Sequence, residues 1–341
     1  MSLLRIPTCY ATCSIGNGPE HTLQRKLDAI ASAGFSSIEL SFPDLISFAS
    51  QHLQREVPED DYDALCIAGE LIAIICKEKG LRILVLQPFA NFEGWPQGSE
   101  KRKKAFKRAR GWIRIMKALG TDMLQVGSSD SPDIVTVSDY IAHDLTELAA
   151  LLAEHKFYLA YENWCWSTHA PSWKHVWHIV QKVNLPNVGL CLDTFQIAGS
   201  EWADPTTHSG LIEDVPRETL EEEFKRSLEQ LSTTVPKDKI YFLQISDAYK
   251  PMTPLSREVD ESGLKPRGRW SHDFRPRPYD GGYLPVVDMT KAVLKTGFRG
   301  HFSMEIFDSG PDGSGKGYDL NEFARLAMQS HRRLLEDCSG I

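Results

Sequence analysis

Short apolar runs of strand length alternate with longer amphipathic segments along almost the whole chain of 341 residues. Eight of these runs predict strands, and each is followed by a segment whose apolar residues recur with the period of a helix. The predicted strands cover residues 6–11, 37–40, 81–86, 123–126, 158–161, 188–192, 240–245 and 301–306. The predicted helices cover residues 23–33, 64–79, 100–119, 137–155, 173–183, 217–233, 286–296 and 320–336.

This alternation limits the architecture. Strands that alternate with helices pair in parallel, and the helices cover the sheet. Eight such units favour a closed (β/α)8 TIM barrel over an open doubly wound sheet. A dinucleotide-binding fold is disfavoured because no predicted strand leads into a GxGxxG motif. We therefore expect residues 1–341 to form a single TIM-barrel domain, with a long irregular loop at about 247–285 after the seventh strand.

Composition narrows the classes of partner. The formal net charge is -8, from 46 acidic and 38 basic residues, and there is no long basic run of the kind that binds nucleic acid. No apolar stretch is long enough to span a membrane, and the N-terminal residues do not resemble a signal peptide. The seven cysteines include no CxxC pair, which is typical of free thiols in a reducing compartment. We expect a cytoplasmic protein with a small-molecule substrate and neither a nucleic-acid nor a membrane partner; a homo-oligomer is left open.

Four predicted strands in the second half of the chain end at residues with a side-chain oxygen: Glu162, Asp193, Gln244 and Glu305. Parallel strands that end side by side would bring these four side chains to one mouth of the barrel, where barrel enzymes place their active sites. Three carboxylates and an amide together favour a bound cation, and oxygen ligation favours Mg²⁺ or Mn²⁺ over thiolate-bound zinc. The alternative is that the four residues only mark strand ends.

Further candidates lie at other strand ends and in loops. Glu39 and Gln87 end the second and third strands, and we expect them to contact substrate; the alternative is a supporting or surface role. His169 follows the fifth strand as a candidate acid or base, or else is an ordinary loop histidine. His272 and Arg275 lie in the long loop and are candidate substrate contacts, since an arginine there would hold a substrate carboxylate. A solvated surface loop is the alternative.

The motifs around these residues resemble those of the fungal 3-dehydroshikimate dehydratases. The resemblance covers roughly residues 5–307 in the same order. Single motifs are shared across the xylose-isomerase-like TIM barrel (sugar phosphate isomerase/epimerase) superfamily, but their combination is more specific. The motifs include Leu86-Gln87-Pro88-Phe89, Tyr161-Glu162-Asn163-Trp164-Cys165-Trp166-Ser167-Thr168 and Gly189-Leu190-Cys191-Leu192-Asp193-Thr194-Phe195.

The resemblance implies a divalent-metal-dependent lyase of quinate and shikimate catabolism, which converts 3-dehydroshikimate to protocatechuate and water. It implies that one Mg²⁺ or Mn²⁺, with Co²⁺ as a further candidate, binds the same four strand-end residues. It also implies that Glu162 and Glu305 are the acid/base pair. Some bacterial members carry histidine three residues after the metal-binding aspartate, whereas this chain has Gln196, which argues against a histidine proton shuttle there.

Three other functions compete with a dehydratase. A sugar isomerase or epimerase would use the same enolate chemistry on a keto-sugar and return the proton instead of expelling water. An apurinic-site endonuclease is disfavoured because that class needs several metals and many histidine ligands, whereas the seventh strand here ends at Gln244. A catalytically inactive barrel used for binding is disfavoured by the intact set of four ligands.

Overall fold

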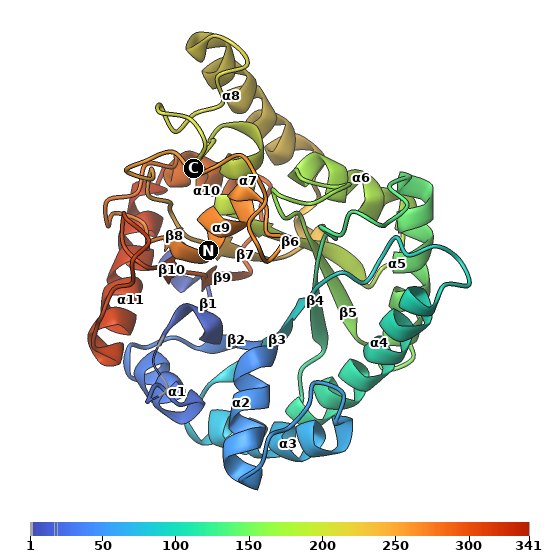
Figure 1. Cartoon of the computed structure of the whole chain (residues 1–341). Helices are drawn as coiled ribbons and strands as arrows, with labels where there is room; N and C mark the ends of the chain where they lie inside the picture. The colour runs from blue at the N-terminus through green and yellow to red at the C-terminus, as the bar shows by residue number, and fades with distance from the viewer. Residues whose placement is uncertain (1–2, 17, 19, 341) are drawn as a thin grey trace.

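The computed structural model describes residues 3–16, 18 and 20–340, and eight parallel strands form a closed barrel in it (Figure 1). The order around the barrel is β1-β2-β3-β4-β5-β6-β7-β9, so sequence neighbours pair throughout and β9 closes on β1. The predicted TIM barrel is confirmed. The barrel strands are β1 (Thr8–Ala11), β2 (Ser37–Ser41), β3 (Arg82–Phe89), β4 (Met123–Gly127), β5 (Tyr158–Glu162), β6 (Val188–Asp193), β7 (Ile240–Ile245) and β9 (His301–Met304).

Helices surround the barrel, and their apolar faces pack on the outer faces of the strands (Figure 1). The ring closes where the last helix packs on the first. The eight predicted helices are confirmed to within a few residues at each end. The helices are α1 (Leu23–Ser32), α2 (Phe42–Leu53), α3 (Tyr62–Glu78), α4 (Glu100–Leu119), α5 (Ser138–Ala153), α6 (Trp173–Val183), α7 (Thr194–Glu201), α8 (Arg217–Thr234), α9 (Pro266–Asp273), α10 (Val286–Lys295) and α11 (Leu320–Asp337).

A second, smaller apolar cluster fills the barrel interior. Its members come from strands around the ring: Cys9, Leu84, Val85, Ala160, Cys191 and Phe242. Side chains alternate between the two faces of a strand. The residue two positions after an interior residue therefore faces the interior again, one layer nearer the strand ends. Glu162 follows Ala160 in this way, Asp193 follows Cys191, and Gln244 follows Phe242.

Two short helices directly follow strands and were absent from the sequence prediction. Helix α2 begins straight after β2, where the Ser41 side chain accepts a hydrogen bond from the Asp44 N–H. Pro43 suggests a loop but is tolerated in the first turn of a helix. Helix α7 begins straight after β6, where Asp193 Oδ1 accepts the Phe195 N–H at 2.8 Å. In both cases the strand ends in the capping residue, so no loop separates the two elements.

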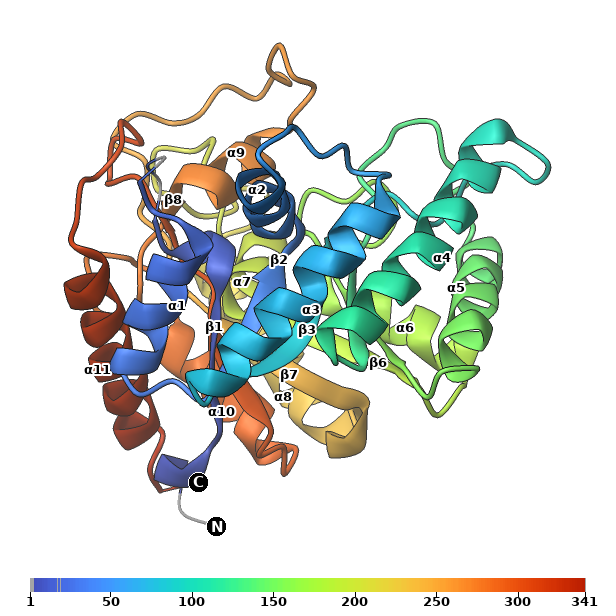
Figure 2. The same ribbon diagram turned by 90° about the horizontal axis from the view of Figure 1, so that it is seen from below.

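The segment after β7 is more ordered than the predicted irregular loop at 247–285. It contains α9, and then β8 (Phe274–Arg275), which pairs antiparallel with β10 (Phe307–Asp308). These elements lie over the end of the barrel opposite the chain termini (Figure 2). The pairing aligns Arg275 with Phe307, two residues beyond Glu305. An arginine of the long loop is thus fixed beside the strand ends.

Two further expectations concern the cysteines and the membrane. All seven cysteines are free thiols, as their spacing predicted. Within residues 3–16, 18 and 20–340, none of the helices combines the length and apolar character needed to cross a bilayer.

Candidate metal centre and active site

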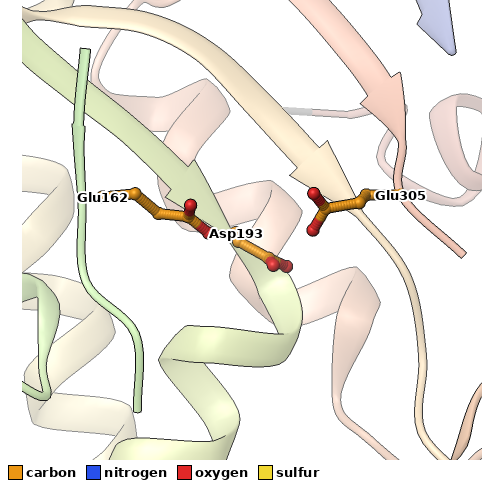
Figure 3. Close-up of side chains that lie close together, drawn as sticks. All are labelled: Glu162, Asp193 and Glu305. Atoms are coloured by element: carbon orange, nitrogen blue, oxygen red, sulfur yellow. The ribbon is translucent and has the colours of Figure 1, made fainter. Parts of the chain in front are cut away.

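Three carboxylates converge at the C-terminal mouth of the barrel (Figure 3). Glu162 ends β5, Asp193 ends β6, and Glu305 directly follows β9. One oxygen from each lies within 4.8 Å of the others, and all three residues are buried. The convergence expected from the strand ends is therefore present for these three side chains.

The buried position makes this group of carboxylates electrostatically costly. Burial raises the pKa of Glu162, and the charges of Glu305 and Asp193 raise it further. Burial also raises the pKa of Asp193 and of Glu305, although the Arg275 guanidinium opposes both rises. A divalent cation among the carboxylates would favour their charged forms. The electrostatics therefore favour a cation at this place.

The hydrogen bonds of Glu162 leave one of its oxygens available. Glu162 Oε2 accepts hydrogen bonds from Gln125 Nε2 and from Trp164 Nε1, the latter at 3.1 Å. Glu162 Oε1 is buried and has no partner among the described residues. An unpartnered carboxylate oxygen beside two further carboxylates fits the oxygen ligands of a hard divalent cation. The three acidic residues can thus hold a metal ion.

Gln244 belongs to the same network, but its amide nitrogen faces the carboxylates. Gln244 Nε2 donates to Glu39 Oε2 and to Glu305 Oε1, each at 2.9 Å. Gln244 Oε1 accepts from the Cys191 thiol at 3.1 Å. Ligation through Oε1 would need a half-turn of the amide, so the role of Gln244 as a ligand stays a prediction. Glu39 is fully buried here, and burial raises its pKa to about 7.

Arg275 is held within the site. Its Nη2 donates to Asp193 Oδ2 at 2.7 Å and lies 2.9 Å from Glu305 Oε2. Its Nε and Nη1 donate to Ser246 and Ser271. Burial opposes its charge, but the neighbouring carboxylates keep the pKa of Arg275 above its ordinary value.

These bonds give Arg275 a different position from the one expected from the sequence. The guanidinium also lies over the Phe195 ring, 4.6 Å from its centroid. Although Arg275 lines the pocket, its guanidinium is bonded to two carboxylates and two serines. It acts as a fixed counter-charge for Asp193 and Glu305, and a substrate carboxylate would have to compete with both.

A pocket of about 330 Å³ opens above the carboxylates. Gln87, Gln196 and His272 contribute polar groups to its lining, as the sequence prediction expected for the first and the last. Burial lowers the pKa of His272. The rings of Trp164 and Trp166 form an apolar wall, stacked with their centroids 5.1 Å apart. The pocket therefore suits a small ring with polar substituents.

His169 lies apart from this pocket. Its side chain is 1% exposed, and its Nε2 is 2.9 Å from Glu93 Oε1. The same oxygen of Glu93 accepts the Tyr161 hydroxyl at 3.0 Å. His169 thus links the loop after β5 to the loop after β3. It does not lie beside the three converging carboxylates, where an acid or base would be needed.

Two contacts of the site were missed by the sequence analysis. Gln125 and Trp164 both donate to Glu162, but neither was among the expected site residues. Gln125 lies near the end of β4, which is the same signal that identified the candidate ligands. Trp164 had no such signal because an indole two residues beyond a strand end is not typical of a metal centre.

Comparison with known proteins places this barrel in a family. Residues 27–330 match the model described as xylose isomerase-like TIM barrel. The chain belongs to the xylose isomerase-like TIM barrel family. One relative is the 3-dehydroshikimate dehydratase of Neurospora crassa, which is 33% identical over 84% of this chain and 82% of its own. The 3-dehydroshikimate dehydratase of Pseudomonas aeruginosa is 29% identical over 85% of this chain, but the match spans only 37% of that longer protein.

Solved structures of xylose isomerase-like proteins share the fold. A xylose isomerase-like TIM barrel/4-hydroxyphenylpyruvate dioxygenase fusion protein superposes with a TM-score of 0.71 at 25% identity, covering 96% of this chain and 42% of that one. The IOLI protein, solved with a bound zinc atom, gives a TM-score of 0.67 at 17% identity, covering 98% of this chain and 100% of that one. The second likeness concerns the fold alone.

We predict that Arg275→Met destabilises this xylose isomerase-like barrel when it is free of divalent metal. Removing the guanidinium leaves two buried carboxylates without their counter-charge, a change that typically costs about 3–5 kcal/mol. Thermal unfolding after dialysis against EDTA would show the loss. Added Mn²⁺ should raise the unfolding temperature of the variant more than that of the parent, because the cation replaces the missing positive charge. The exposed Arg257 supplies the control, Arg257→Met, which should unfold like the parent; equal stability of Arg275→Met would contradict the prediction.

Proposed function

We propose that this protein is a divalent-metal-dependent 3-dehydroshikimate dehydratase, a carbon-oxygen lyase that forms protocatechuate and water. The observation that carries the proposal is the buried group of Glu162, Asp193 and Glu305 at the catalytic end of the barrel. The likeness to the Neurospora crassa enzyme, which extends over most of both chains, supports the choice of substrate. The likeness to dehydratases of two Pseudomonas species supports it further.

The residues present fit one Mg²⁺ or Mn²⁺, with Co²⁺ as a further candidate. We assign the ion to Glu162, Asp193 and Glu305, with Gln244 as the fourth ligand after a half-turn of its amide. When bound, such an ion supplies Lewis-acid polarisation of a carbonyl oxygen. The ligand set contains oxygen donors only, which matches the preference of these hard ions.

The chain's own carboxyl groups would carry the protons. The proton next to the substrate ketone is acidic, and Glu162 or Glu305 is the base that removes it. Both carboxyl groups line the pocket, where they can reach a ring substrate. The hydroxyl then leaves as water with a proton returned from this pair, and transfer of a further ring proton to the former ketone oxygen completes the aromatic product.

The pocket supplies the remaining contacts to a ring substrate. We assign Gln87 and His272 as polar contacts, since both line the pocket. The stacked wall of Trp164 and Trp166 would cover one face of the ring and exclude water. Glu39 lies deeper and bonds Gln244, so we assign it to support of the ligand set. Arg275 would fix the positions of Asp193 and Glu305 during turnover.

We predict that Asp193→Asn abolishes tight metal binding but keeps the fold. The asparagine oxygen can still cap α7 by accepting the Phe195 N–H, while the negative charge is lost. Isothermal titration of metal-free protein with Mn²⁺ should show affinity reduced by more than about tenfold. Asp204→Asn, which removes a charge outside the triad, is the matched control and should bind like the parent. Unchanged affinity in Asp193→Asn would remove Asp193 from the ligand set.

We predict that the metal-loaded protein converts 3-dehydroshikimate into a compound that absorbs in the aromatic ultraviolet and co-elutes with protocatechuate. Chelation should stop the reaction, and Mg²⁺, Mn²⁺ or Co²⁺ should restore it. Glu162→Gln and Glu305→Gln should lower kcat more than they raise KM, because both groups act on the transition state. If the loaded protein leaves 3-dehydroshikimate untouched and interconverts keto-sugars, the dehydratase assignment is wrong and an epimerase takes its place.

A further inference from the structure

The two oxygens of Glu162 have unequal surroundings. Gln125 and Trp164 both donate to Oε2, whereas Oε1 has no partner among the described residues. Glu162 is 2% exposed, so water does not compete freely for either oxygen. The two donors come from different elements, since Gln125 belongs to β4 and Trp164 follows β5. The carboxylate is therefore held in one orientation, with Oε1 left for another partner.

The Trp164 indole packs directly against the backbone of β4. Gly127 pairs with Glu162 across the β4–β5 ladder. A Cβ atom added to Gly127 would lie 2.2 Å from Trp164 Cε2, so the indole contacts the glycine backbone directly. The backbone N–H of Trp164 donates to Ser128 Oγ at 2.9 Å, which fixes the main chain below the indole. Only glycine at position 127 leaves the indole close enough to reach Glu162 in this way.

The other neighbour of the indole is also anchored. Trp166 stacks on Trp164 with an angle of 22° between the rings. Its Nε1 donates to Asp130 Oδ2 at 3.2 Å, and its carbonyl accepts the Lys265 Nζ–H at 2.9 Å. The loop after β7 therefore holds Trp166 against Trp164, and the position of the indole is determined from several sides.

We propose that Trp164 is a positioning residue for Glu162. Its indole N–H holds Oε2, so that Oε1 is left available to a divalent cation. The inference rests on the proposed metal-dependent function. Because the same ring forms part of the pocket wall, Trp164 links the face that covers a ring substrate to the orientation of a metal ligand.

Two substitutions separate these roles. Trp164→Phe removes the indole N–H but keeps an aromatic ring in the wall. Partners that orient metal ligands typically contribute 10- to 100-fold in affinity, so we expect Mn²⁺ to bind Trp164→Phe roughly 10- to 100-fold more weakly in calorimetric titration of metal-free protein. Trp95→Phe is the matched control, since it loses an indole N–H bonded to the Asn91 carbonyl and lies outside the pocket lining; its Mn²⁺ affinity should stay within about twofold of the parent.

A spectroscopic signal provides a test that a purely structural role would not move. The chain contains eight tryptophans, and within the part of the chain that the structure describes only Trp164 donates to a proposed metal ligand. Neutralising the Glu162 charge with Mg²⁺, which does not itself quench fluorescence, should change the emission of that indole. The change should appear in the parent and in Trp95→Phe, and should be absent in Trp164→Phe. Gly127→Ala displaces the ring by a different route and should weaken Mn²⁺ binding as well.

The outcomes distinguish this inference from the function on which it rests. If the parent binds Mn²⁺ and Trp164→Phe binds it equally well, the positioning role is overturned and the metal centre stands. If Trp164→Phe binds more weakly but the loaded parent does not act on 3-dehydroshikimate, the positioning role stands and the dehydratase assignment falls. If the parent binds no divalent cation, both are overturned.

Discussion

The repulsion among three buried carboxylates is the constraint on which the catalytic end of this barrel depends. Glu162, Asp193 and Glu305 lie close together with little access to water, and like charges so placed resist ionisation. Arg275 supplies one positive charge to these carboxylates. The amides of Gln244 and Gln125 and the indole of Trp164 donate hydrogen bonds to them. One cation and three donors do not neutralise three carboxylates. The remaining negative charge favours a further cation at this place.

Much of the fold follows from local sequence signals. The order of strands and helices was predictable because each unit carries its own apolar period. Helices α2 and α7 were missed because each begins directly after the last residue of a strand. No loop residues mark the boundary in the sequence. The predicted irregular loop also contains α9 and β8, whose pairing partner β10 lies beyond β9. The period of apolar residues within one segment carries no information about which distant segment will pair with it.

The candidate site likewise has a part that the sequence predicted and a part that it did not. Positions at strand ends were predictable because the barrel itself determines where they point, and three of the four expected ligands converge. The contacts of the loop residues His169 and Arg275 were not, since a loop's path depends on contacts elsewhere in the chain. His169 turns away to Glu93, whereas Arg275 turns inward to Asp193 and Glu305. The amide orientation of Gln244 is likewise determined by its neighbours, Glu39 and the Cys191 thiol.

The pairing of β8 with β10 has a consequence for how such a barrel can diversify. It fastens Arg275 next to Glu305 through backbone hydrogen bonds, independently of the residues between β7 and α9. That intervening stretch includes exposed positions such as Met252 and Val259, and it also supplies Leu264 to the pocket lining. Insertions or exchanges there can reshape the entrance while the charge balance beneath it is preserved. The part of the chain that shapes the entrance is thereby separate from the part that positions the buried carboxylates.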